Sequence, residues 1–461
     1  MFGTPLDYAS LKAVLLHMDA NIRIQISHRI PSLRNVEKLV PLKLNTLLIP
    51  DEMTTSINGT CYQVGIYRHY PSGNVPRPVK EDNNDGGARN DFDKFGFPVP
   101  SGRSVVLPGD VSLRENNENE DGNDTDEREM AIRQDLHVLE SALRIKTELK
   151  SKGITVKEYL DSLKPIEWED YGTQEDRIRE ILRYSYADSL EFRIEENQVS
   201  LLPFECRRTG TKPPFTCYIQ LSIKKEKLVQ IQRFEYTKKL FEAMKQLNQA
   251  LFGGRTMPIL VKSFRTWGSV DMYRFPVGYR IQANDVRVTD QKLVHENFMQ
   301  ILEPSKCLNT LWLFITIRNP DFVLNSFVQN SETLRIVTTF LNIRGLIQKI
   351  GDLSHRKIYV HNFHKLYSTE VYFEFVQNWL SRSRPVGAKC CIGLTSEETG
   401  KEVLKMIRTE NEETKRTERC VTVSINGSTR CEVFYVPFDE NKFVVRNRRC
   451  NWVMKMRIIE V

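Results

Sequence analysis

The sequence predicts a mixed α/β fold of the α+β type, and three observations support this. Apolar residues recur at every second position of 216–223, which indicates a half-buried strand, and 228–234 reads as its hairpin partner. The spacing then changes to that of an amphipathic helix over 238–251, and 258–262 is a third, apolar strand. Further along the chain, predicted strands recur at intervals of 23 to 31 residues, with helical patterns between most of them.

These patterns divide the chain into seven segments. We expect a short helical head (1–50), a β- and turn-rich arm (51–113), an acidic linker that is disordered (114–125) and a helical segment (126–200). These are followed by a central ββαβ hub (201–265), a set of strand/helix repeats (266–409) and a β-rich C-terminal cap (410–461).

The head is predicted to hold three short amphipathic helices. In the first, Leu11, Val14, Leu15 and Met18 fall at i, i+3, i+4 and i+7 behind a candidate N-cap at Ser10. Isoleucines at four-residue spacing indicate a second helix over 22–30, and 33–40 follows as a third. Helices this short bury little surface by themselves, so they need a partner, either the rest of this chain or another protein.

The helical segment is expected to begin with one long helix over 126–152, which ends before Gly153, and to continue with shorter helices over 155–163 and 174–186. At the other end of the chain, the Asn426-Gly427 pair predicts a hairpin turn between two strands of the cap.

The repeats of 266–409 are typical of a leucine-rich-repeat-like solenoid, because one strand and one helix recur in each unit of 20 to 30 residues. Leu308-x-x-Leu311-x-Leu313 matches the leucine-rich motif once. In such a solenoid the strands near 311 and 334 are sheet neighbours, and residues of opposite parity, such as Trp312 and Thr316, form the candidate binding surface. An open α/β layer is the alternative.

Charge is distributed unevenly along the chain. Residues 1–200 carry 25 basic and 34 acidic side chains, a net charge of −9, whereas the remainder carries 41 basic and 25 acidic side chains, a net charge of +16. A basic half of this kind attracts nucleic acid or an acidic protein, or is a solvated surface that the acidic half partly offsets.

Cysteine usage and hydropathy place the protein inside the cell. The nine cysteines are odd in number, include no CxxC pair, and hold one adjacent pair, Cys390-Cys391, whose side chains point to opposite faces of a strand. No apolar run approaches the ~20 residues that a membrane span needs. We therefore expect a cytoplasmic or nuclear protein without a membrane segment.

No pattern typical of catalysis or of a cofactor site is present. Gly393 precedes Gly400-Lys401, but six residues separate the glycines where a phosphate loop has four. His361 and His364 lack a third metal-ligating group nearby in the sequence. The sequence therefore predicts a protein that is not an enzyme and that uses no metal and no cofactor.

Several blocks of the sequence resemble a nematode-expanded family, the F-box C proteins, whose members carry a nematode-specific domain of unknown function. The matching residues are Pro5-Leu6, Tyr8, Ser10-Leu11-Lys12, Val14-Leu15, Met18, Asn21 and Arg23 in the first helices; Ile30-Pro31-Ser32-Leu33 and Val36-Glu37-Lys38 after them; Tyr62 to Pro71 and Asn84 to Arg89; and Phe204 to Arg208, Pro213 to Thr216 and Phe234 to Phe241.

The resemblance implies that the head is an F-box, a helical module that docks on the Skp adaptor of cullin–RING ubiquitin ligases. The positions implied to contact the adaptor are Pro5, Leu6, Leu11, Val14, Leu15 and Met18. The alternative is that these helices only cover the core of their own chain.

Together these observations predict a non-enzymatic protein-interaction module. The resemblance gives it the role of an F-box-type substrate-recognition subunit of a ubiquitin ligase, with a Skp-type adaptor and a protein target as partners. The alternatives are a nucleic-acid-binding protein that uses the basic C-terminal half, which we consider unlikely, and an enzyme of a type that the sequence does not reveal.

Overall fold

A computed structural model of the chain describes residues 7–99, 102, 105–113, 125–163, 172–266, 270–289, 292, 296–303, 308–315, 325–338, 349–350, 353, 355–362, 368–394, 396–410, 413–438 and 451–461. The predicted acidic linker falls almost wholly outside these residues, as do Thr316 and His364. The chain divides into two compact units: the first is made of Met1–Thr60, Val106–Arg114 and Asn248–Val461, and the second of Cys61–Val105 and Glu115–Leu247.

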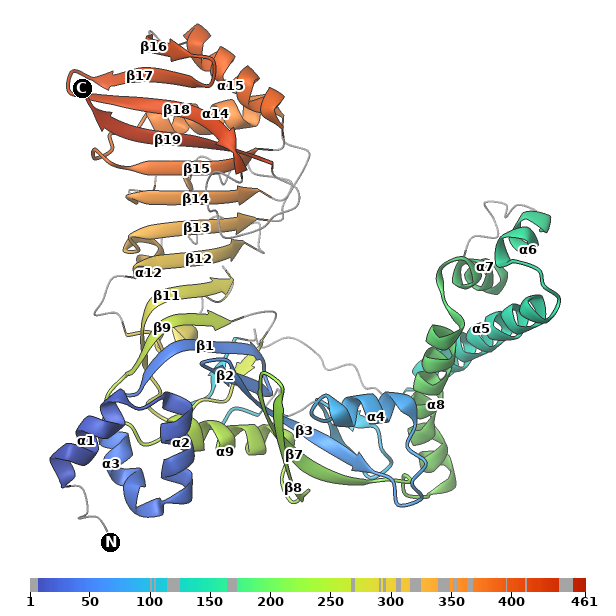
Figure 1. Cartoon of the computed structure of the whole chain (residues 1–461). Helices are drawn as coiled ribbons and strands as arrows, with labels where there is room; N and C mark the ends of the chain where they lie inside the picture. Colours follow the sequence, from blue (N-terminus) through green and yellow to red (C-terminus); the bar gives the residue numbers. More distant parts are fainter. Residues whose placement is uncertain are drawn as a thin grey trace. The chain divides into compact units, whose positions relative to one another are not determined.

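The first unit begins with the helical head and continues into one large sheet (Figure 1). The head consists of α1 (Tyr8–His17), α2 (Ala20–Arg29), the 3-10 turn η1 (Pro31–Leu33) and α3 (Arg34–Leu39), which are the three helices that the sequence predicts. Asp7 caps α1 and Asp19 caps α2, each by accepting hydrogen bonds from backbone N–H groups of the first turn.

The sheet of the first unit has a parallel middle and antiparallel ends. Its parallel strands lie side by side in the order β1 (Lys43–Asp51), β9 (Ile259–Thr266), β11 (Ile281–Thr289), β12 (Thr310–Ile315), β13 (Thr333–Thr338), β14 (Lys357–Asn362) and β15 (Lys389–Leu394). The strands near 311 and 334 are therefore neighbours, and five consecutive strands from β11 to β15 pair in sequence order (Figure 1).

Antiparallel strands extend the sheet at both ends. β2 (Thr54–Ile57) pairs with β1. At the other end, β19 (Trp452–Glu460) inserts between β15 and β18 (Thr429–Pro437), which is followed by β17 (Cys420–Asn426) and β16 (Glu413–Thr417). The predicted hairpin turn at Asn426-Gly427 joins β17 to β18, and the Asn426 side chain accepts hydrogen bonds from the backbone N–H groups of Ser428 and Thr429.

Helices of the first unit connect and cover these strands. They are α11 (Glu296–Met299), α12 (Ser326–Gln329), α14 (Thr369–Leu380) and α15 (Glu397–Glu410), and the short strands β6 (Val111–Ser112) and β10 (Met272–Tyr273) form a separate antiparallel pair. α15 packs on the sheet so closely that a Cβ added to Gly400 would lie 2.9 Å from the ring of Tyr435. α14 in turn packs on α15.

The second unit combines a helical subdomain with a smaller sheet. Its helices are α4 (Arg77–Asn84), α5 (Asp126–Ser151), α6 (Val156–Ser162), α7 (Gln174–Tyr184) and α8 (Ala187–Thr209), and its strands are β3 (Thr60–His69), β7 (Thr216–Lys225), β8 (Leu228–Glu235) and the short pair β4 (Asp91–Phe92) and β5 (Pro98–Val99). α5 is the predicted long helix and ends before Gly153, whose φ of +68° is the left-handed conformation typical of a helix end.

The elements of the predicted hub are present in the expected order, because α9 (Leu240–Phe252) and β9 follow the hairpin of β7 and β8. They do not form one block, however. β7 and β8 belong to the second unit, whereas β9 lies in the parallel sheet of the first unit. The boundary expected at residue 50 falls inside β1, because 43–51 is a strand that pairs with β9.

Alternation along the parallel strands separates a buried face from a second face. Two rows of apolar side chains run across the strands on the buried face, and every member is at most 4 % exposed: Val286, Leu311, Leu334, Ile358, Cys390 and Met456 in one row, and Val288, Leu313, Ile336, Val360, Ile392 and Met454 in the other. Leu394 and Tyr435, which lie against Gly400 of α15, share this face. The core of the first unit therefore lies between the sheet and its helices.

Leu313→Ala is expected to destabilise the first unit by about 2–5 kcal/mol, because Leu313 is fully buried and its removal leaves a cavity. Phe314→Ala is the matched control on the next residue of the same strand, where the side chain is 37 % exposed. It should cost only about 0.5 kcal/mol. Urea denaturation followed by tryptophan fluorescence measures both. Equal losses in the two variants would contradict the assignment of the faces.

Candidate functional site

The second face of the parallel sheet carries a row of arginine and aromatic side chains. Parallel register places Arg265, Arg287, Trp312, Arg335 and Tyr359 directly beside one another on β9, β11, β12, β13 and β14. We call these five residues the arginine–aromatic row. Its members come from strands that are far apart in the sequence, so register alone brings them together.

The row is held together by stacking of guanidinium groups on aromatic rings. The guanidinium carbon of Arg287 lies 4.3 Å from the centre of the Trp312 ring, and that of Arg335 lies 4.8 Å from it. Arg335 also lies 4.3 Å from the centre of the Tyr359 ring. Trp312 further stacks on the His361 ring, at 5.6 Å between centroids and 5° between planes. Each cation–π contact contributes about 0.5–2 kcal/mol.

Positive charge is concentrated in this row. Burial lowers the pKa of Arg287, and the neighbouring charges of Arg265 and Arg335 lower it further, while Asp285 in the adjacent row acts in the opposite sense. Burial likewise lowers the pKa of Arg335. The arginines therefore crowd one another on a partly buried surface, and an incoming anion would relieve this repulsion.

Arg335 has an unused hydrogen-bond donor. Its Nη1 atom is shielded from solvent and has no hydrogen-bond partner among the described residues. A buried N–H group without an acceptor costs about 1–3 kcal/mol, and a ligand that supplies a carboxylate oxygen recovers this cost. The fork of donors on a guanidinium group suits the two oxygens of a carboxylate.

The thiols on this part of the sheet are not prepared for nucleophilic chemistry. Burial raises the pKa of Cys391, which lies beside Tyr359 on the neighbouring strand β15, to about 12, and burial also raises the pKa of Cys390 on the opposite face. Both thiols stay protonated at neutral pH, whereas the thiolate is the reactive form. Within the described part of the chain, no three His, Cys, Asp or Glu side chains are grouped so that they could hold a metal ion.

The predicted adaptor-docking residues are placed differently from one another in the head. Pro5 and Leu6 lie outside the described residues, and Leu11 and Met18 are half-buried. Val14 is 43 % exposed, whereas Leu15 is only 2 % exposed and packs inside the head. A partner could therefore reach Val14 but not Leu15 in this arrangement. Other large apolar side chains that the head exposes are Tyr8, Ile22, Ile30 and Leu39.

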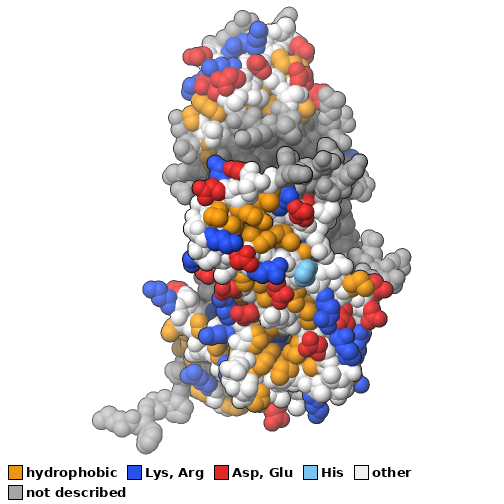
Figure 2. Space-filling model, turned by 90° about the vertical axis from the view of Figure 1, so that its right-hand side faces the viewer, with side chains coloured by type: hydrophobic (Ala, Val, Ile, Leu, Met, Phe, Trp, Pro, Cys, Tyr) orange, Lys and Arg blue, Asp and Glu red, His pale blue; other side chains and the backbone are white. Residues whose placement is uncertain are grey.

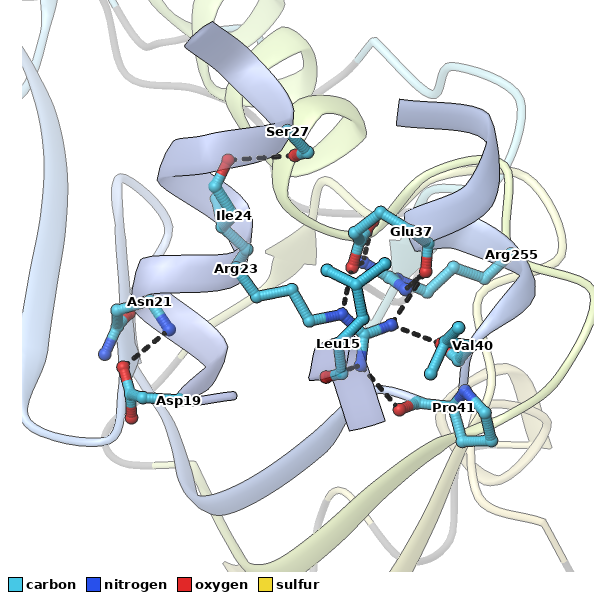
Figure 3. Close-up of polar contacts among 10 residues, drawn as sticks. All are labelled: Leu15, Asp19, Asn21, Arg23, Ile24, Ser27, Glu37, Val40, Pro41 and Arg255. Carbon is cyan, nitrogen blue, oxygen red and sulfur yellow. Dashed lines mark hydrogen bonds and ion pairs between the residues drawn. The ribbon is translucent and has the colours of Figure 1, made fainter. Parts of the chain in front are cut away.

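A buried ionic cluster explains how the head is attached to the rest of the first unit (Figure 3). Glu37 of α3 accepts a hydrogen bond of 2.7 Å from Arg23 Nε of α2 and another of 2.7 Å from Nη2 of Arg255, which follows α9. All three side chains are at most 7 % exposed. The Arg23 guanidinium also donates to the backbone carbonyls of Leu15 and Pro41.

The sequence blocks that carry the family resemblance in the second unit make internal contacts. Gly65 of β3 lies against Gly86, so closely that a Cβ at Gly65 would be 2.3 Å from the Gly86 carbonyl oxygen. Asp91, which is 1 % exposed, accepts a hydrogen bond of 2.6 Å from the Tyr236 hydroxyl and one of 2.9 Å from the Leu240 backbone N–H. The positions in these blocks that we traced therefore serve the fold.

The second unit also contains a cavity of about 480 Å³, lined by the α4 region, the 85–98 segment, α5 and α8. Its walls combine side chains of both charge signs, such as Arg68 and Glu196, with the rings of Phe97 and Phe204. This mixture selects no single class of ligand, so the arginine–aromatic row is the stronger candidate for a functional surface.

Comparison with known proteins gives one match. Residues 239–395 match a family model described as a domain of unknown function (DUF3557). The matched region extends from α9 to β15 and contains the whole arginine–aromatic row. No curated protein and no solved structure matches the chain. None of the helices in the described ranges has both the length and the apolar character needed to cross a lipid bilayer.

The free energy of unfolding of the first unit is expected to depend on pH through His361, which stacks on Trp312 of the row. Burial, together with Arg335, lowers the pKa of His361 from 6.5 to about 4. Between pH 6.5 and about pH 4, His361 binds a proton in the unfolded chain but not in the folded chain. The contribution of His361 to the free energy of unfolding is therefore complete above pH 6.5. It decreases as the pH falls through this window, by at most about 1.4 kcal/mol per pH unit.

His361→Phe keeps a flat ring against Trp312 but cannot titrate. Urea denaturation between pH 4 and pH 7 should show a shallower loss of stability in this variant than in the wild type. Identical pH dependence in the two proteins would contradict the assignment.

Proposed function

We propose that the chain is a non-enzymatic protein-interaction module that serves as an F-box-type substrate-recognition subunit of a cullin–RING ubiquitin ligase. In this proposal the head docks on a Skp-type adaptor, and the arginine–aromatic row binds a protein target. The observation that carries the proposal is the row itself, in which three arginines are prepositioned on a sheet and one buried donor, Nη1 of Arg335, has no acceptor among the described residues.

We further propose that 266–409 works as a leucine-rich-repeat-like solenoid. Pairing of β11 to β15 in sequence order supports this, because a solenoid places each repeat beside the next one along the chain. Such an arrangement offers an extended strand face to a partner. The chemistry of the row then selects a target with an acidic segment, whose carboxylates can pair with Arg287 and Arg335.

Support for adaptor docking comes from the resemblance of the head to an F-box and from its exposed apolar side chains. Glu37 pairs with Arg23 inside the head and with Arg255 outside it, and Val14 stays exposed on the surface of the head. Exposed apolar residues are the groups through which a short helical module binds a partner helix.

The nucleic-acid alternative rests on the net charge of +16 in the C-terminal half. The row adds an interleaving of basic and aromatic residues, which is typical of single-strand binding. The geometry disfavours it. Binding of bases requires free aromatic faces, whereas the Trp312 ring is already covered by Arg287, Arg335 and His361 and is only 5 % exposed. On the one side of the molecule drawn in Figure 2, basic side chains are interspersed with acidic and apolar ones.

Val14→Asp tests adaptor docking. Because Val14 is exposed, the aspartate should leave the head folded, but it places an unpaired carboxylate in the proposed apolar interface at a cost of several kcal/mol. Co-expression of the tagged full chain with a Skp adaptor should recover the adaptor with the wild type and not with this variant. Val277→Asp, at a site that is 71 % exposed, is the matched control and should behave as wild type. Wild-type protein that never recovers the adaptor would refute the ligase assignment.

The double variant Arg287→Gln/Arg335→Gln tests target binding separately. Hydrogen bonds to charged groups are worth about 1.5–3 kcal/mol each, so the variant should bind the target more than about tenfold more weakly. Affinity purification with mass spectrometry should then show loss of an acidic protein while the adaptor is retained. Arg356→Gln, on an exposed arginine outside the row, is the control. Target recovery that is unchanged in the double variant, or retention of nucleic acid in place of a protein, would contradict the proposal.

A further inference from the structure

Strand β8 of the second unit is exposed along its whole length. All eight of its residues are exposed, and four of them carry large apolar side chains: Leu228 at 74 %, Val229 at 52 %, Ile231 at 45 % and Phe234 at 50 %. Among the strands that the structure describes, β8 is the last at its end of the sheet, and it pairs there with β7 along one side (Figure 1). Its other backbone edge therefore faces outward.

This edge lacks the features by which proteins usually protect a terminal strand. Such strands commonly carry a proline, a bulge or several lysines, which prevent pairing with another chain. β8 contains no proline, and its register with β7 is continuous from Leu228 to Glu235. Its single arginine, Arg233, is already engaged, because it stacks on the Tyr67 ring at 3.6 Å and donates a hydrogen bond to Gln220.

The sequence around β8 is complementary to itself when it is read in the opposite direction. In an antiparallel pair formed across a twofold axis perpendicular to the sheet, side chains that lie opposite each other must have the same parity. With the axis at Ile231, Leu228 lies opposite Phe234, Gln230 opposite Gln232, Val229 opposite Arg233, and Ile231 opposite its own copy. One position beyond the strand, Lys227 lies opposite Glu235.

We propose that the protein forms a homodimer in which two copies of β8 pair antiparallel about Ile231. This register joins two apolar pairs of Leu228 with Phe234 and two ion pairs of Lys227 with Glu235 across the interface. Neither Lys227 nor Glu235 has an ion-pair partner among the described residues of its own chain. The partner that the edge selects is therefore a second copy of this chain.

The neighbouring registers of the same parity are less favourable. With the axis at Gln230, Lys227 would lie opposite Arg233 of the other copy, which places like charges together. With the axis at Gln232, Ile231 would lie opposite Arg233, and Val229 opposite Glu235, so that apolar side chains face charged ones. The axis at Ile231 pairs Lys227 with Glu235 and Leu228 with Phe234. It leaves Val229 opposite Arg233, whose guanidinium group is already stacked on the Tyr67 ring of its own chain.

Analytical ultracentrifugation of the full chain over a wide range of concentrations tests the proposal. One pair of strand edges is small beside the roughly 1,200–2,000 Å² of a standard stable interface, so we expect a reversible dimer of moderate affinity. Ile231→Lys places two ammonium groups at the axis and should abolish the dimer. Tyr184→Lys is the control, since Tyr184 is an exposed apolar residue of the second unit outside β8, at 77 %, and it should leave the dimer unchanged.

Charge reversal tests the register without removing any apolar contact. Lys227→Glu and Glu235→Lys should each weaken self-association about tenfold, because both ion pairs become like-charge pairs. An equimolar mixture of these two single variants should form a heterodimer, since residues 227 and 235 then face opposite charges across the interface. The double variant Lys227→Glu/Glu235→Lys should regain the affinity of the wild type.

A wild-type chain that stays monomeric at all concentrations overturns the proposal, whether or not β8 accepts a strand from another protein. A dimer that Ile231→Lys leaves intact also overturns it. A dimer that Ile231→Lys abolishes, but that the charge variants neither weaken nor restore, overturns the register. These results are independent of the adaptor and target experiments, because β8 contributes no residue to the head or to the arginine–aromatic row.

Discussion

The common register of the parallel strands is the constraint on which the rest of the first unit depends. From β11 to β14, the strands are aligned so that apolar residues lie beside apolar residues of the next strand and form two buried rows. The residues between them in each strand therefore share the other face of the sheet. A slip of one residue in β13 would move Leu334 and Ile336 to the second face and turn Arg335 toward the core. Burial of Leu313 and display of Arg335 are thus two consequences of a single register.

The head is joined to the rest of the first unit by buried polar contacts, which include a shared carboxylate and a hydrogen bond of 3.0 Å from the Asn21 side chain to the Ile57 carbonyl. Glu37 is shared by Arg23 from the same head and by Arg255 from the chain that precedes β9. Removal of one partner from a buried ionic group costs about 3–5 kcal/mol, because the remaining charge is left without compensation. Because the short helices of the head bury little apolar surface, this ionic cluster contributes to the attachment of the head. Apolar residues such as Val14 remain exposed.

Local periodicity in the sequence was sufficient to predict the three head helices, α5, the β7–β8 hairpin and the order of the strands. It missed α8, because Pro203 lies within that helix and its exposed positions are polar. It could not separate Val14 from Leu15 either, since both belong to the same apolar pattern and only the packing of α1 decides which is buried. Among the row residues, parity alone placed Trp312 on the second face. The arginines beside it come from other strands and become neighbours only through pairing between them.

Photo-crosslinking from Phe314 tests the central claim, that the face of the arginine–aromatic row binds an acidic protein, most directly. Phe314 shares this face with Trp312 and is 37 % exposed, so a photoreactive phenylalanine analogue fits there with little change. We expect light-dependent attachment to an acidic protein in cell extract, and none from the same analogue at Tyr184 in the second unit. Absence of a crosslink at Phe314, or attachment to nucleic acid alone, would contradict the account.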